Sequence, residues 1–102
     1  MKLLTQKIIK RMPKLYSTQN LLPEEKRIIV KFFCPWNNWT WYVLEGKEQG
    51  PDDWRFFGYV KGHFNELGYF LLSELREVRG PWGLKIERDV YFDEKKTLQD
   101  VM

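Results

Sequence analysis

The sequence predicts a single α+β domain, a twisted antiparallel β-meander of four to five strands with helices packed on one face. A length of 102 residues suits one compact domain and leaves no room for two. Segments rich in β-branched and aromatic residues follow each other closely after residue 26, and their short connections favour antiparallel hairpins. Apolar residues recur at helical spacing at the N-terminus, and Ser73 is placed to cap a short helix after the fourth of these segments.

The first expected element is a helix that begins after Thr5 and ends near Met12. Thr5 has the side-chain oxygen of a typical N-cap, and Ile8 and Met12 recur on one face at helical spacing. Pro13 has no backbone N–H, so it ends or kinks a helix near the residue before it. The polar stretch over residues 17–26 then predicts a loop.

Four strands are expected in the middle of the chain. Alternation places Trp41 and Val43 on one face of the second strand, and Phe56 and Val60 on one face of the third. Segments with Gly, Pro, Asn or Asp separate the strands and predict the turns. The four strands cover residues 27–34, 39–45, 54–61 and 68–71.

The last third of the chain predicts short elements. Ser73 is the expected N-cap of a helix that runs to about Val78. The segment RGPWG over residues 79–83 breaks this helix, and KIERDVYFD over residues 85–93 predicts one more strand. Residues 97–102 predict a final helical turn.

The composition excludes several classes of protein. With 43% hydrophobic and 30% charged residues, the chain is neither a disordered tail nor a membrane protein. The net charge of +3 and the pI near 9.0 are mildly basic, whereas dedicated duplex binders show a clustered excess. Cys34 is the only cysteine, which favours a reducing compartment. The N-terminus alternates apolar and basic residues, unlike a signal peptide, so we expect a cytoplasmic protein that binds no membrane.

The sequence shows no recognisable catalytic, metal or cofactor site. His63 and Cys34 are each the only residue of their type, and Cys34 is typical of a small buried hydrophobe. A carboxylate-rich metal site would need Glu66, Glu87 and Asp89 to converge with His63, and the same residues also fit a solvated strand edge. Zinc-ligand spacing and Gly-rich phosphate loops are both absent. We therefore expect no catalytic residue, no metal and no cofactor.

Basic residues form the first feature that suggests binding. Lys7, Lys10, Arg11 and Lys14 lie on one side of the first helix if that helix continues past Pro13. Such a stripe binds phosphates in a salt-sensitive manner. The basic residues are also explained as the ordinary solvated face of an amphipathic helix. We favour that interpretation, because amphipathic helices are common.

Aromatic residues of the third strand form the second feature. The segment 55–60, with Phe57 and Tyr59, matches five positions of the RNA-recognition-module strand signature, whose rings stack on bases. The match fails at Phe56, where the signature has Gly, and at Gly62, where it has an aromatic residue. The strand order also differs from that module, so we favour core and cross-strand packing for these rings.

Three of the five tryptophans lie where a ring is expected near the surface. Trp36 is in a turn, Trp54 begins a strand directly after two Asp, and Trp82 lies in a Gly-Pro break. Aromatic residues in turns beside charges are typical anchors of protein interfaces. Each ring can instead fold back over the edge of the core, and the sequence leaves both alternatives open.

An ordered series of motifs runs along nearly the whole chain. It comprises KLLT (2–5), LY (15–16), WTWYV (39–43), FFGYV (56–60), ELGYF with LSEL (66–75) and ERDVYF (87–92). This series resembles a bacterial family of domains of unknown function carried by plasmids, integrative elements and phages. The resemblance implies no catalytic residue. It implies that the gene for this chain lies among the accessory genes of mobile elements. Such genes often encode inhibitors of host defence or regulators of transfer.

These observations lead to a small non-catalytic binding protein of a mobile genetic element as the first hypothesis. Its expected partner is another protein, such as a host or defence protein that it inhibits. The alternative is a nucleic-acid-binding accessory protein that uses the basic helix face with Phe57 and Tyr59. A metal-dependent hydrolase around Glu66, Glu87 and Asp89 is a third hypothesis, and the oligomeric state is left open.

Overall fold

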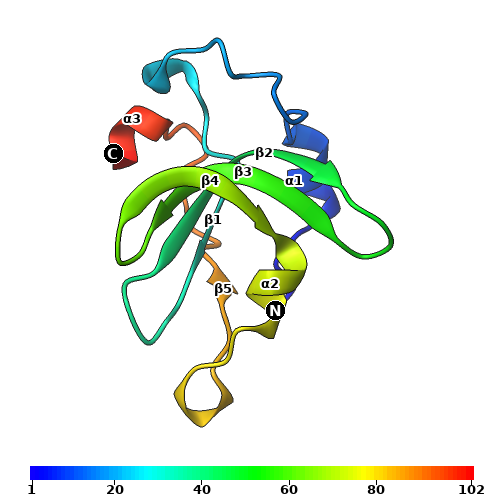
Figure 1. The fold of residues 1–102 in the computed structure, drawn as a ribbon, viewed down its shortest axis with the longest axis vertical. Helices are drawn as coiled ribbons and strands as arrows, with labels where there is room; N and C mark the ends of the chain where they lie inside the picture. The colour runs from blue at the N-terminus through cyan, green and yellow to red at the C-terminus, as the bar shows by residue number, and fades with distance from the viewer.

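A five-stranded antiparallel sheet forms the centre of the protein (Figure 1). The computed structural model describes all residues from 1 to 102. The strand order β4-β3-β2-β1-β5 means that four strands form a meander in chain order and the last returns to pair with the first. The strands are β1 (Val30–Phe33), β2 (Thr40–Glu48), β3 (Trp54–Lys61), β4 (Asn65–Leu71) and β5 (Glu87–Arg88).

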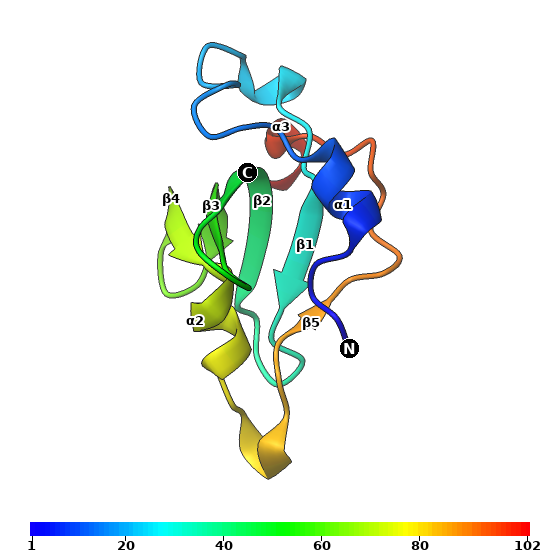
Figure 2. The ribbon, with the colours of Figure 1, turned by 90° about the vertical axis from the view of Figure 1, so that its right-hand side faces the viewer.

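Three short helices lie on both faces of this sheet. They are α1 (Gln6–Arg11), α2 (Leu72–Glu77) and α3 (Leu98–Val101), with single 3-10 turns at Pro23–Glu25 and Pro81–Gly83. Figure 2 shows α1 and α2 beside the sheet, with α3 at one end. No helix has the length and apolar character needed to cross a membrane.

The main core lies between one face of the sheet and the helices α1 and α2. Ile8 of α1 and Leu72 of α2 join one buried cluster with Phe32, Val43 and Phe56 of the sheet. A second, smaller cluster lies on the opposite face, because α3 inserts its own residue there. It contains Ile28, Tyr42, Leu44, Tyr59 and Leu98. The expectation that all helices pack on one face is therefore wrong for α3.

The predicted helix boundaries are close to those of the structure. The Ile8 N–H donates to the Thr5 hydroxyl oxygen at 3.3 Å, which confirms Thr5 as the N-cap of α1. The prediction of Ser73 as an N-cap is wrong, because the N-cap of α2 is Leu71 and the helix already begins at Leu72. The Glu74 carboxylate instead accepts the Leu71 N–H at 2.8 Å, and Ser73 is hydrogen-bonded to another loop.

The strand predictions differ in how far each strand extends. The bounds of β3 are those predicted, whereas β2 continues through Glu48 and β4 begins earlier, at Asn65. The prediction of a long final strand over residues 85–93 is wrong, because only Glu87–Arg88 pairs with β1. After Asp89 the chain turns, because the Tyr91 N–H donates to the Asp89 carboxylate at 3.0 Å.

A β-bulge interrupts the alternation of β2. Val43 pairs with Gly58, but the next aligned pair is Glu45 with Phe57, so Leu44 is the extra residue. By alternation Glu45 would lie with Trp41 and Val43 in the main core. The bulge turns its carboxylate to the opposite face instead. This change of direction positions the tyrosine site described below.

Candidate functional site

The segment over residues 79–85 forms a short protruding hairpin, called here the Trp82 hairpin. Arg79 pairs with Lys85 in an isolated antiparallel bridge, and the Leu84 N–H donates to the Pro81 carbonyl at 3.1 Å. Trp82 has φ 61° and ψ 21°, and Gly83 has φ 74°. Two successive residues with positive φ make a type I′ turn, which favours Asn or Gly at both positions.

Trp82 is an unfavourable residue for this turn. A non-glycine residue in the left-handed region costs about 1–2 kcal/mol, and bulky side chains are rare there. Packing does not offset that cost, because the Trp82 side chain is 98% exposed. Local strain together with exposure is typical of functional positions. Neither the backbone nor the core explains this tryptophan.

The base of the hairpin is held firmly against the protein. A Cβ at Gly80 would lie 2.3 Å from the Trp36 ring, so glycine allows the hairpin to lie directly on that indole. Trp36 is half-buried and packs against the main core. The Arg79 guanidinium donates to the carbonyls of Arg76 and Val78 at the end of α2, where a cation is favourable.

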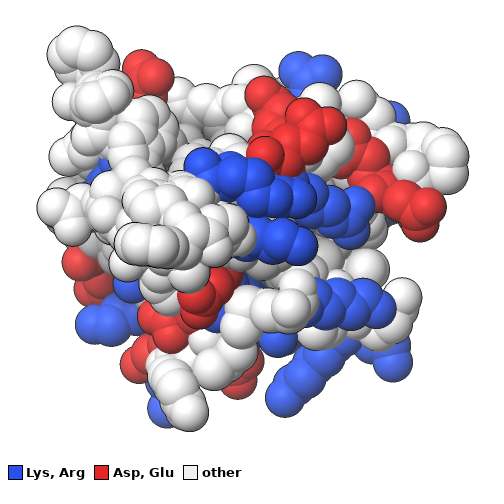
Figure 3. All heavy atoms as spheres, turned by 90° about the horizontal axis from the view of Figure 1, so that it is seen from below, with Lys and Arg blue, Asp and Glu red and all other residues white.

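Positive charge is present around the hairpin. The hairpin itself carries Arg79 and Lys85 and no acidic residue. Figure 3 views the end of the molecule that lies lowest in Figure 1. It shows Lys and Arg gathered in a band across this face, with Asp and Glu along its border and a protruding patch of uncharged atoms. This end of the molecule thus carries uncharged protruding atoms beside a band of positive charge.

A second exposed aromatic group depends on Glu45. Glu45 is only 3% exposed. Its carboxylate accepts hydrogen bonds from the backbone N–H groups of Tyr16 (2.7 Å) and Thr18 (2.9 Å). The Thr18 hydroxyl donates to the same carboxylate. These bonds hold Tyr16 at φ 71°, the second strained aromatic residue with an exposed side chain.

Tyr16 completes an aromatic group on the outer part of the sheet, called here the tyrosine site, which comprises Tyr16, Arg55, Phe57 and Tyr69. Tyr69 lies centrally, with ring centroids 6.3 Å from Tyr16 and 5.0 Å from Phe57. The Arg55 guanidinium lies 4.9 Å from the centre of the Tyr69 ring, within the range of a cation–π contact. Desolvation, followed by the hydrogen bond to Tyr16, raises the pKa of Tyr69.

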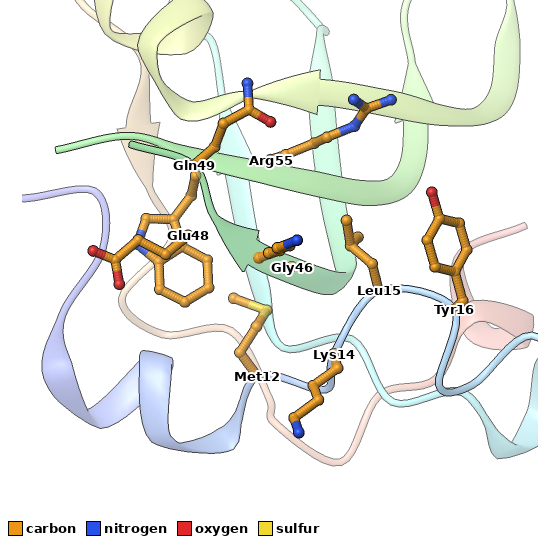
Figure 4. Close-up of a pocket in the computed structure, with 10 residues that line it drawn as sticks. Met12, Lys14, Leu15, Tyr16, Gly46, Glu48, Gln49 and Arg55 are labelled. Carbon is orange, nitrogen blue, oxygen red and sulfur yellow. The ribbon is translucent and has the colours of Figure 1, made fainter. Parts of the chain in front are cut away.

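A groove of about 770 Å³ adjoins the tyrosine site (Figure 4). Its walls are the chain after α1 and the hairpin of β2 and β3, joined where the Gly46 N–H donates to the Pro13 carbonyl at 2.9 Å. In Figure 4 Met12 points toward Gly46, whereas Lys14 points away from the groove. The lining combines apolar and charged side chains, with Tyr16 and Arg55 shared with the tyrosine site.

The structure places the predicted aromatic residues in different environments. Trp82 alone is fully exposed, while Trp36 and Trp54 are half-buried against the main core. Tyr59 is buried and stacks on Tyr42 with ring centroids 6.5 Å apart, so it offers no free face for a base. Phe57 is half-buried beneath Tyr69.

The predicted basic stripe is not one continuous surface. Because α1 ends at Arg11, Lys14 does not lie on the helix. Arg11 is engaged elsewhere, since its guanidinium donates to the Ile29 carbonyl at 3.1 Å and contacts Glu94 at 3.2 Å. Lys7 and Lys10 are exposed and form no ion pair.

The residues considered for chemistry do not converge. No three His, Cys, Asp or Glu side chains are placed to hold a metal ion. Glu66 is on β4 and Glu87 on β5, at opposite edges of the sheet, and Asp89 pairs with Lys31 at 3.5 Å. Cys34 is buried, and this burial raises the pKa of its thiol and disfavours the thiolate.

Comparison with known proteins places the chain in a family. A family model described as "Protein of unknown function (DUF2958)" matches residues 3–102. This chain belongs to the DUF2958 family. No curated protein matches it and no solved structure matches it. Membership in DUF2958 confirms the resemblance to a family of domains of unknown function, and that description assigns no activity to the site.

The sequence indicated part of the site. Trp82 was identified as a candidate because it lies in a Gly-Pro break, and Phe57 because of its strand motif. Tyr16 and Tyr69 were missed as binding residues. The contact that positions Tyr16 joins residues 29 apart in the chain, and no local pattern reveals such a bond.

Proposed function

We propose that this chain is a small non-catalytic binding protein that recognises another protein through Trp82. The observation that carries the proposal is the exposed indole on a strained turn, because it stabilises nothing within the chain. Tryptophan is the residue type most enriched among those that dominate the binding energy of interfaces. A binding role accounts for both the ring and the strain.

The shape and charge of the hairpin describe the surface it fits. A single projecting ring with Pro81 and Leu84 beside it fits an apolar pocket better than a flat surface. Arg79 and Lys85 pair at the base of the hairpin, and their positive charges favour carboxylates at the rim of that pocket. The expected partner is therefore a protein with a concave apolar site bordered by acidic residues.

Trp82→Asn tests this proposal without disturbing the fold, because type I′ turns prefer Asn before Gly. The full chain is used as bait in a bacterial lysate. We expect the native chain to recover a partner in stoichiometric amount, and Trp82→Asn to recover less than about a tenth as much, which corresponds to about 1.4 kcal/mol of binding energy.

Tyr91→Asn is the matched control, because Tyr91 is also an aromatic residue with 93% exposure but is not part of the hairpin over residues 79–85. It should recover the partner as the native chain does. Equal recovery by Trp82→Asn and the native chain, or no stoichiometric partner with folded native chain, contradicts the proposal.

We further propose that the partner is a host or defence protein and that binding inhibits it, as expected of an accessory protein of a mobile genetic element. The support for this step is the resemblance carried by the motifs from WTWYV to ERDVYF. The purified partner should lose activity when the native chain is added. Full activity in the presence of saturating native chain argues against inhibition.

Nucleic-acid binding is the second candidate function, and the exposed, unpaired Lys7 and Lys10 favour it. It predicts binding to a single-stranded oligonucleotide that weakens steeply with salt. A gel-shift titration at low salt is the measurement, with a Lys7→Gln, Lys10→Gln double variant as comparison. An unshifted oligonucleotide excludes this function.

A further inference from the structure

The two edges of the sheet are protected to very different degrees. At one edge, β5 has only two residues, both charged, and the N-terminal segment lies against it. The Arg88 N–H donates to the Met1 sulfur, and its guanidinium donates to the Lys2 carbonyl. At the other edge, β4 has seven residues, and no strand pairs with its outer side. Figure 2 shows β4 at the margin of the sheet.

β4 also lacks the features that keep an open edge from pairing with another chain. Such edges are usually guarded by Lys, Pro or a bulge. β4 contains none of these residues, its register with β3 runs without a shift, and Glu66 is its only charged residue. Leu67 and Tyr69 lie on one face and are 45% and 46% exposed. The free edge is therefore apolar and regular.

Gly68, at the centre of β4, has no explanation within the single chain. A Cβ at Gly68 would meet no atom within 4 Å, and its φ is not positive. Its neighbour Gly58 differs, since a Cβ there would lie 2.1 Å from the Tyr42 carbonyl oxygen. Glycine in the interior of a strand weakens it and often marks the close approach of another backbone.

We propose that β4 pairs antiparallel with β4 of a second copy of this chain, about a two-fold axis at Gly68. This register places Leu67 of each copy opposite Tyr69 of the other, an aliphatic–aromatic pair of the kind that stabilises sheets. It sets the two Gly68 residues face to face and brings no like charges opposite each other. The interface lies in β4, so it goes beyond the role proposed for the Trp82 hairpin.

The strand itself limits the strength of this dimer. Seven residues span roughly 24 Å. A single strand pair buries less than the roughly 1,200–2,000 Å² of a stable interface. The dimer should therefore be weak and depend on concentration, with monomer at micromolar concentration and dimer at the higher concentrations used for sedimentation.

Gly68→Cys tests the register directly. The two-fold axis places the two introduced thiols on residues whose Cα atoms are about 4.5–5.5 Å apart, within reach of a disulfide. We expect a disulfide-linked dimer under mild oxidation. Glu66→Cys is the matched control, because the same register separates its two copies by about 14 Å. The native chain is the blank, since its only cysteine, Cys34, is buried.

Leu67→Lys gives a second, independent measurement. A charge at the free edge should raise the dimer dissociation constant at least about tenfold in sedimentation equilibrium. Phe64→Lys is its control, because Phe64 is 81% exposed in the turn outside β4, and this variant should dimerise like the native chain. A native chain that stays monomeric at all concentrations, or equal crosslinking at positions 66 and 68, overturns the proposal.

Discussion

The two faces of the sheet are covered to different extents, and the difference separates folding from recognition. On one face, α1 and α2 enclose an extended core around Phe32, Val43 and Phe56. On the other, Leu98 of α3 covers only a small cluster. Tyr16, Arg55 and Tyr69 of the tyrosine site stay exposed beyond this cluster, whereas Phe57 packs against it. The first face therefore accounts for most of the stability, while the second combines a small core with a surface free to bind.

The largest expected effect belongs to the covered face. Phe56 is fully buried and contacts the rings of Phe32, Trp54 and Phe70. Phe56→Ala leaves a cavity among these rings and should lower the free energy of unfolding by about 3–5 kcal/mol. Urea denaturation followed by circular dichroism measures this change. A loss below about 1 kcal/mol would show that the main core does not dominate stability.

The small core of the other face should contribute less. Leu98→Ala removes the residue through which α3 covers Tyr42 and Leu44. We expect a loss of about 2 kcal/mol, the lower end for a buried leucine, because this cluster has fewer neighbours to lose. Hydrogen exchange should show the loss first in α3. A destabilisation equal to that of Phe56→Ala would remove the distinction between the two faces.

Acid should weaken the attachment of α2 on the covered face. The Ser73 N–H lowers the pKa of Asp53, with further contributions from the Ser73 hydroxyl and the Trp54 N–H. A carboxyl whose pKa is lower in the folded state than in the unfolded state stabilises the protein at pH values above its unfolded-state pKa. This contribution is lost as the pH falls through the folded-state pKa. Thermal stability should therefore decline below about pH 4.

Asp53→Asn should lower the stability at neutral pH and flatten this acid decline. Asp52→Asn is the control, because the Asp52 side chain forms no hydrogen bond or ion pair. An acid decline of the same size in Asp53→Asn and the native chain would show that other carboxyls cause it.

The smallest effect on stability is expected at the exposed part of the second face. Tyr69→Thr keeps a residue type that strands favour and removes a half-exposed ring. At concentrations where the chain is monomeric, the melting temperature should stay within about 2 °C of the native value. A larger decrease would mean that the tyrosine site is part of the core.

Local patterns were sufficient to predict the faces of the central strands. Alternation placed Trp41 and Val43 on one face, and the structure has both in the main core, with Tyr42 between them in the cluster on the opposite face. The β3 bounds and the α1 cap followed from equally local signals. These features were predictable because each depends on residues close together in the chain.

Features that depend on distant contacts were not predictable. The bulge at Leu44 turns Glu45 away from the core, and only the loop around Tyr16 explains why its carboxylate is buried there. The final strand stops after Arg88 because the Asp89 side chain closes a turn. The partly buried positions of Trp36 and Trp54 were not predictable either, because the sequence does not show which neighbours cover these rings.

The position of α3 at the far end of the sequence has a consequence for synthesis on the ribosome. Strands β1 to β4 pair with their chain neighbours, so this meander can form as soon as residue 71 has emerged. Ile28 and Leu44 remain uncovered until Leu98 arrives. During that interval the nascent chain exposes its second face as well as the open edge of β4, and chaperone contacts should concentrate there.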